Sequence, residues 1–139
     1  MTRFIDCLCR EIRMVAERLQ EKESVGTVFI GGGTPSLLDV HSIEKIIHTL
    51  SNCFDLRTGA EISMEVNPGE ISLEKLITIH DLGINRLSMG FQSFQPELLK
   101  FLTRIHNADD CIKAWHQARQ AGFQNINVGE LPEGSLRHV

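Results

Sequence analysis

Three segments of this chain alternate polar and apolar residues, and stretches with helical periodicity separate them. They are EISMEV at 61–66, RLSMGFQ at 86–92 and NINVG at 125–129. A parallel strand covered by helices on both faces is apolar along its whole length, so we expect helices only on the apolar face of these strands. The polar face then borders water or a ligand, as the interior of a barrel does. An antiparallel sheet with one solvated face is the alternative that the pattern leaves open.

Helical and strand patterns alternate along the chain, which predicts a parallel α/β sheet with right-handed crossovers. The predicted helices cover 4–20, 39–50, 72–82, 96–102 and 107–121, and the predicted strands cover 27–30, 61–66, 86–91 and 125–128. A closed eight-stranded barrel needs roughly 200–250 residues, whereas this chain has 139. We therefore expect an incomplete parallel (β/α) barrel of about four strands with flanking helices, whose outer strands have unpaired edges.

Composition argues against several classes of protein. The length suits one domain, and a net charge of -4 without any Lys/Arg-dense stretch argues against nucleic-acid binding. An apolar run of about 18 residues is absent from the sequence, so no membrane-spanning helix is expected. Acidic Asp6 lies too near the start for a signal peptide. The four cysteines fit no disulfide framework, which predicts a reducing, cytoplasmic compartment and leaves a mitochondrial parent protein open.

A glycine triplet follows the first predicted strand, in Gly31-Gly32-Gly33-Thr34-Pro35. Residues without a Cβ let a ligand approach the main chain closely. Glu65 and Gln92 stand at the carboxyl ends of later strands, where barrels carry their functional groups, and together they suit sugar hydroxyls. The planar fork of Arg104 suits a ligand carboxylate. The alternatives are a ligand-free turn, a structural bond from Glu65 to a neighbouring backbone, and a solvated surface arginine.

Five ordered sequence blocks resemble the radical S-adenosylmethionine (SAM) enzymes of the HemN/HemW group. They are VFIGGGTPSLL at 28–38, SMEVNPG at 63–69, GINRLSMGFQSF at 83–94, LTRIH at 102–106 and GFQNINV at 122–128. Five blocks in order make a chance likeness very improbable. The group includes oxygen-independent coproporphyrinogen III oxidases and haem chaperones, and the residues of these blocks are closer to those of the haem chaperones. The resemblance implies a partial (β/α)6-type barrel.

The resemblance also implies which residues bind SAM. They are Gly32, Gly33, Thr34, Glu65, Gln92 and Arg104. By the family pattern, the glycines and the threonine meet the amino-acid end of SAM, the carboxylate and the amide side chain contact the ribose, and the arginine contacts the SAM carboxylate. The resemblance assigns no catalytic residue and no metal ligand within this chain.

The family carries a CxxxCxxC motif whose three thiolates bind a [4Fe–4S] cluster, and this sequence does not contain that motif. Cys7, Cys9, Cys53 and Cys111 do not resemble a cluster site, and ordinary free thiols are expected. Without cluster ligands no electron reaches SAM, so we expect this chain by itself to perform no radical chemistry.

The end of the chain also departs from the family pattern. Gly129 stands where the family has an aspartate that completes the SAM pocket. We expect residues 1–128 to form the central part of a radical SAM core domain, truncated at both ends. Residues 129–139 are expected to form a divergent, disordered tail.

Three functions follow as hypotheses. The first is a fragment of a radical SAM protein of porphyrin or haem metabolism that keeps part of the SAM pocket, with haem or a porphyrinogen as a further partner. The second is a haem-binding or haem-delivery protein without oxidase activity, because histidines can serve as axial ligands. The candidates are His41, His48, His80, His106, His116 and His138. The third is an inert or regulatory fragment that associates through its exposed strand edges.

Overall fold

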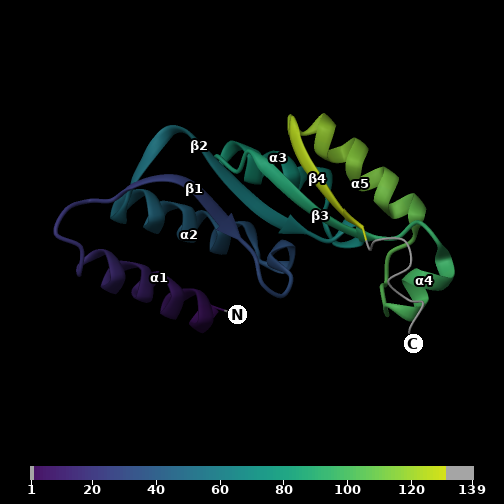
Figure 1. The fold of residues 1–139 in the computed structure, drawn as a ribbon, viewed down its shortest axis with the longest axis horizontal. Coiled ribbons are helices and arrows are strands. Elements are labelled where there is room, and N and C mark those ends of the chain that lie inside the picture. Colours follow the sequence, from purple (N-terminus) through teal and green to yellow (C-terminus); the bar gives the residue numbers. More distant parts are fainter. Residues whose placement is uncertain (1, 131–139) are drawn as a thin grey trace.

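Four parallel strands form one sheet in the order β1-β2-β3-β4 (Figure 1). The structure is a computed structural model that describes residues 2–130, without the side chain of Glu130. The strands are β1 (Ser24–Ile30), β2 (Asp55–Val66), β3 (Arg86–Gln92) and β4 (Asn125–Glu130). The helices are α1 (Thr2–Ala16), α2 (Val40–Cys53), α3 (Leu73–Asp81), α4 (Pro96–Phe101) and α5 (Ala108–Gln120), with short 3₁₀ turns η1 (Pro35–Leu37) and η2 (Pro68–Glu70).

The all-parallel sheet confirms the predicted α/β class, and the antiparallel alternative is wrong. Helical segments connect each strand to the next, so every strand runs the same way and every carboxyl end meets one edge of the sheet (Figure 1). Strands β1 and β4 lie at the two ends of the strand order.

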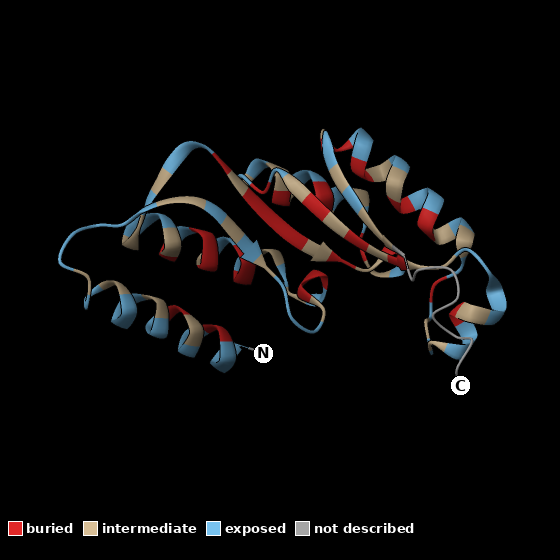
Figure 2. Ribbon diagram, viewed as in Figure 1, coloured by how far each residue is buried: buried red, intermediate tan, exposed pale blue. Residues whose placement is uncertain are grey.

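The helices α2, α3 and α5 pack on one face of the sheet and bury a continuous apolar core. Ile43 of α2, Leu76 of α3 and Ala118 of α5 share this core with Met64 and Leu87 of the strands. Along β3 every second residue is buried and the residues between them are only partly covered (Figure 2). The two-faced pattern of the sequence therefore predicted correctly which side of the strands packs against helices.

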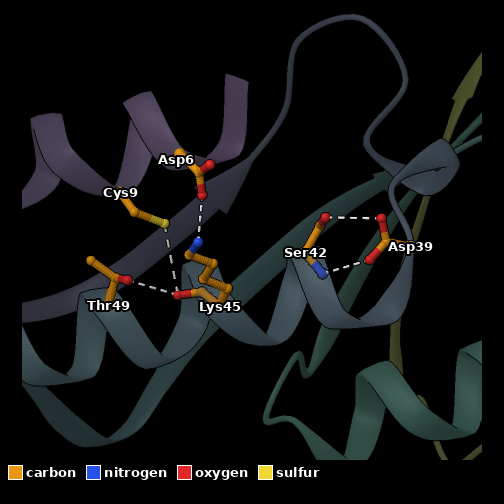
Figure 3. A network of polar contacts seen from close by, with 6 residues as sticks. All are labelled: Asp6, Cys9, Asp39, Ser42, Lys45 and Thr49. Carbon is orange, nitrogen blue, oxygen red and sulfur yellow. Dashed lines mark hydrogen bonds and ion pairs between the residues drawn. The ribbon is translucent and has the colours of Figure 1, made fainter. Parts of the chain in front are cut away.

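Helix α1 packs against α2 through a smaller apolar cluster and several polar contacts (Figure 3). The ammonium group of Lys45 in α2 pairs with the carboxylate of Asp6. The backbone carbonyl oxygen of Lys45 accepts a hydrogen bond from the Thr49 hydroxyl at 2.8 Å and a longer one from the Cys9 thiol at 3.9 Å. At the start of α2, Ser42 donates its backbone N–H to the carboxylate of Asp39 at 2.8 Å. This bond and the Ser42 hydroxyl lower the pKa of Asp39, as expected for a charged helix cap.

Some element boundaries differ from the predicted ones. Strand β2 begins at Asp55 rather than at residue 61. Its pairing with β1 shifts register between Val25 and Thr27, and residues 57–60 form a bulge there. Strand β4 extends to Glu130, two residues beyond the predicted strand. Residues 131–139 of the predicted tail lie outside the described residues.

Helices α3, α4 and α5 end in the same local structure. A residue with left-handed backbone follows the C-cap and donates its N–H back into the last turn, as in a Schellman motif. This residue is Gly83 after α3 and Gly122 after α5, with φ values of 96° and 101°. After α4 it is Thr103, with φ 53°, a strained choice for a β-branched residue. The next residue returns to the core after α3 and α5, where Ile84 and Phe123 are fully buried.

Replacing Gly83 by alanine tests this reading of the helix ends. No atom lies within 4 Å of the place where a Cβ on Gly83 would stand, so the added methyl meets no obstacle and its cost is purely conformational. We expect Gly83→Ala to lower the free energy of unfolding by about 1–2 kcal/mol in chemical denaturation.

Gly26→Ala in β1 is the matched control, because its Cβ would make only an ordinary contact at 3.5 Å from Arg57 Nη1 and its φ is not left-handed. We expect its unfolding midpoint to change little. Equal midpoints for the two variants would contradict the account.

Candidate functional site

A cavity of about 270 Å³ opens at the carboxyl ends of the strands, on the polar face of the sheet. Its lining residues are Gly33, Thr34, Pro35, Glu65, Val66, Asn67, Ser88, Met89, Gly90, Gln92, Arg104 and Gly129. They come from the loop after β1, from the carboxyl-terminal parts of β2, β3 and β4, from Asn67 after β2 and from the segment after α4. Of the six predicted SAM-binding residues, the fold brings all except Gly32 into the lining of this one cavity.

The three glycines after β1 have different structural tasks. A Cβ on Gly31 would stand 2.4 Å from the ring of Phe29 and 3.2 Å from Cδ of Glu65, so only glycine lets these side chains come so close. Gly32 and Gly33 have φ values of 89° and 63°, which glycine adopts without strain. Nothing lies within 4 Å of a Cβ built on either of them, so the main chain of this loop is bare on that side.

Glu65 and Gly32 connect the first two strand ends. The backbone N–H of Gly32 donates to Oε2 of Glu65 at 2.9 Å. The predicted alternative for Glu65, a structural bond to a neighbouring backbone, is therefore present, and the same side chain also lines the cavity. Gly32 does not line the cavity, and its contact holds the carboxylate in place.

Gln92 ends β3 with a left-handed backbone, at φ 67°. The pairing of β3 with β4 shifts register between Met89 and Gln92, so the strand bulges there. The bulge sends the amide back toward the sheet, where Nε2 lies 3.1 Å from the place of a Cβ on Gly90. A non-glycine residue held in this region costs of order 1–2 kcal/mol, and such strain concentrates at functional sites.

Arg104 reaches the cavity from the segment after α4. Its backbone N–H donates to the carbonyl of Leu99 at 2.9 Å, which fixes the turn from which the side chain extends. Arg104 is half-buried and forms no ion pair within residues 2–130. The cavity thus presents one guanidinium, one carboxylate, two side-chain amides and bare backbone, a set that suits a polar ligand carrying both charges.

Comparison with known proteins identifies the family. The sequence profile described as "Radical SAM superfamily" matches residues 8–132. The chain belongs to this superfamily. The predicted likeness to the HemN/HemW group is confirmed by relatives in both branches.

Two relatives are bacterial haem chaperones. The chain is 35% identical to "Heme chaperone HemW" of Bacillus subtilis (strain 168) over 81% of its length, and 38% identical to the Escherichia coli (strain K12) protein of that name over 83%. It covers 31% of each relative, so it spans about a third of their length. The solved structure titled "Coproporphyrinogen III oxidase (HemN) from Escherichia coli is a Radical SAM enzyme" superposes with a TM-score of 0.85 at 33% identity, over 93% of this chain and 30% of that one.

Sequence reasoning did not assign two residues at or near this cavity, Asn67 and Lys75. Asn67 is not among the six residues that the family pattern assigns to SAM, although it lies at the end of β2 and lines the cavity. Lys75 of α3 donates hydrogen bonds from its ammonium group to the carbonyls of Ser36 and Leu38 and so fastens the loop after the glycines to α3. Burial lowers the pKa of Lys75. No local pattern marks this lysine, because its partners lie almost forty residues earlier in the chain.

The cysteines of the described region differ in their exposure. In residues 2–130 no three His, Cys, Asp or Glu side chains gather closely enough to hold a metal ion. Cys7 is exposed, whereas Cys9 and Cys111 are buried in separate places. Burial, with a smaller effect of Asp110, raises the pKa of Cys111 to about 11, so this thiol stays protonated at neutral pH.

Two of the candidate haem-ligating histidines make contacts within the fold. His106 is buried, and its Nε2 lies 3.1 Å from the carbonyl oxygen of Phe91, so the fold already uses this ring nitrogen. His80 packs edge-to-face on Phe123 with ring centroids 5.0 Å apart. His138 lies outside the described residues.

Within the described part of the chain, no helix is both long and apolar enough to cross a membrane.

Alkylation of the thiols checks the environment of the cysteines. We expect iodoacetamide at pH 8 to modify Cys7 first, because it is exposed, and to modify Cys9 and Cys111 only when denaturant is added. Mass spectrometry of peptides at successive times measures the order. Modification of native Cys111 at the rate of Cys7 would contradict the buried, protonated thiol.

Proposed function

We propose that this chain is the SAM-binding part of a radical SAM protein of haem metabolism, of the HemW haem-chaperone type. One observation carries the proposal: a single cavity gathers Gly33, Thr34, Glu65, Gln92 and Arg104 from four separate parts of the sequence. The chain is 35% and 38% identical to two HemW relatives and 30% and 35% identical to two oxygen-independent coproporphyrinogen III oxidases, so the choice of the chaperone type rests on the residues of the family blocks and not on overall identity. The reducing compartment that its free cysteines suit is the cytoplasm.

Different residues of the cavity bind different parts of the proposed ligand. The fork of Arg104 binds the carboxylate of SAM by two parallel hydrogen bonds. Glu65 and the amide of Gln92 bind the ribose hydroxyls, which both donate and accept. The loop at Gly33 and Thr34 lets the amino-acid end approach the main chain. Gly32 acts indirectly, through its bond to Glu65.

In radical SAM chemistry the bound SAM is the precursor of the radical that attacks the substrate. To the residues of this cavity we assign the binding and orientation of SAM. Because the chain spans about a third of its relatives, the substrate, whether haem or a porphyrinogen, is proposed from the relatives' names and not from a site in this chain.

Calorimetric titration of the purified chain with SAM tests the proposal. We expect measurable binding that Glu65→Ala and Arg104→Ala each weaken by about tenfold or more, because each removes a hydrogen bond that involves a charged group. Circular dichroism checks that both variants keep the fold. A folded chain that does not bind SAM, or unchanged affinity in both variants, would overturn the proposal.

A matched pair of glycine variants separates the cavity from the rest of the sheet. A Cβ on Gly90 would stand 3.1 Å from Nε2 of Gln92 and 3.7 Å from Oδ1 of Asn67, so Gly90→Ala narrows the cavity. Gly26→Ala adds the same methyl to β1, away from the cavity. We expect Gly90→Ala to weaken SAM binding and Gly26→Ala to leave it unchanged.

A further inference from the structure

Asn67 joins the first two loops of the cavity through its main chain. It directly follows β2, and the proline after it favours the extended backbone that it adopts, with φ -91° and ψ 130°. Its backbone N–H donates to Oγ of Ser36 at 3.2 Å. Ser36 is fully buried in η1, so the position of Asn67 is fixed to the loop that carries the glycines.

The side chain of Asn67 is held in one orientation. Its Nδ2 lies 2.9 Å from Oε2 of Glu70 and 3.4 Å from Oγ1 of Thr34. A carboxylate only accepts hydrogen bonds, so the amide nitrogen and not the amide oxygen must face Glu70. The oxygen then faces β3, 3.7 Å from the place where a Cβ on Gly90 would stand. Asn67 and Gly90 both line the cavity, so this oxygen is a fixed acceptor in its wall.

The other polar side chains assigned to the ligand leave the ammonium group of SAM without an assigned acceptor. The amino-acid end of SAM carries a carboxylate and an ammonium group. Arg104 suits the carboxylate, whereas Glu65 is assigned to the ribose and already accepts the bond from Gly32. An ammonium group needs hydrogen-bond acceptors, and the amide oxygen of Asn67 is one. The amide nitrogen of Asn67 bonds to Thr34, which is proposed to meet the amino-acid end of the ligand.

We propose that Asn67 is a binding and positioning residue for the amino-acid end of SAM, an inference that rests on the proposed function. Its Oδ1 accepts a hydrogen bond from the ligand ammonium group, and its Nδ2 holds the hydroxyl of Thr34 toward the same end. The tether to Glu70 fixes the amide for both tasks.

A comparison of three ligands tests this role. SAM and S-adenosylhomocysteine carry the amino-acid end, whereas 5′-methylthioadenosine has the nucleoside without it. Calorimetry on the whole chain is expected to give about tenfold weaker binding of the first two to Asn67→Ala, with methylthioadenosine changed less than about twofold. Asn127→Ala is the matched control, because this exposed asparagine of β4 does not line the cavity, and we expect it to leave all three affinities unchanged.

A second pair of variants keeps Asn67 and changes only its tether. Glu70→Ala frees the amide to rotate, and we expect about threefold weaker binding of SAM and unchanged binding of methylthioadenosine. Glu70→Gln still offers an accepting oxygen, so we expect it to restore the affinity for SAM. These variants decide the question if Asn67→Ala does not fold.

The outcomes separate the two claims. Equal weakening of all three ligands in Asn67→Ala, or no weakening of any, overturns the role of Asn67 while the proposed function stands. A wild-type chain that binds none of the three ligands overturns the proposed function and this inference together.

Discussion

The register between the parallel strands is the constraint on which the rest of the structure depends. Ile30, Met64, Leu87 and Ile126 form one row across the sheet on the helical face. A slip of one residue would turn every side chain of a strand to the other face, so the burial of this row fixes the position of all others. The polar face follows from it, and with it the meeting of the four carboxyl ends at the cavity.

Only one face of the sheet is covered by helices in the described part of the chain, and this explains how a small α/β unit offers an open cavity. Phe29 of β1 is 60% exposed on the polar face, where a complete core would bury an aromatic ring. The chain spans about a third of its haem-chaperone relatives, and the unpaired edges of β1 and β4 end the sheet within residues 2–130. Association through these edges stays a prediction.

Much of this arrangement could be predicted from the sequence, because alternation reports burial directly. The pattern at 86–92 predicted which side of β3 packs, and family resemblance assigned Glu65, Gln92 and Arg104, which the fold brings to one cavity. The early part of β2 was missed, since residues 57–60, which include a glycine, form a bulge whose sequence resembles that of a loop.

Other features depend on contacts between distant parts of the chain and leave no local pattern. Lys75 is indistinguishable from a surface lysine until the carbonyls of Ser36 and Leu38 lie beside it. Thr103 adopts a left-handed backbone that its residue type disfavours, so the backbone preference of threonine predicts a different conformation there. The different tasks of Gly31 and its two neighbours likewise appear only when Glu65 is in place.

Nuclear magnetic resonance of the ¹⁵N-labelled chain, titrated with SAM, tests the central claim that the strand ends form one binding site. We expect amide shifts at Gly33, Glu65, Gln92 and Arg104 to move together along a single binding curve, while amides of the helical face such as Ile47 and Ala118 stay in place. Shifts confined to the helical face, or separate binding curves for these four cavity residues, would contradict the account.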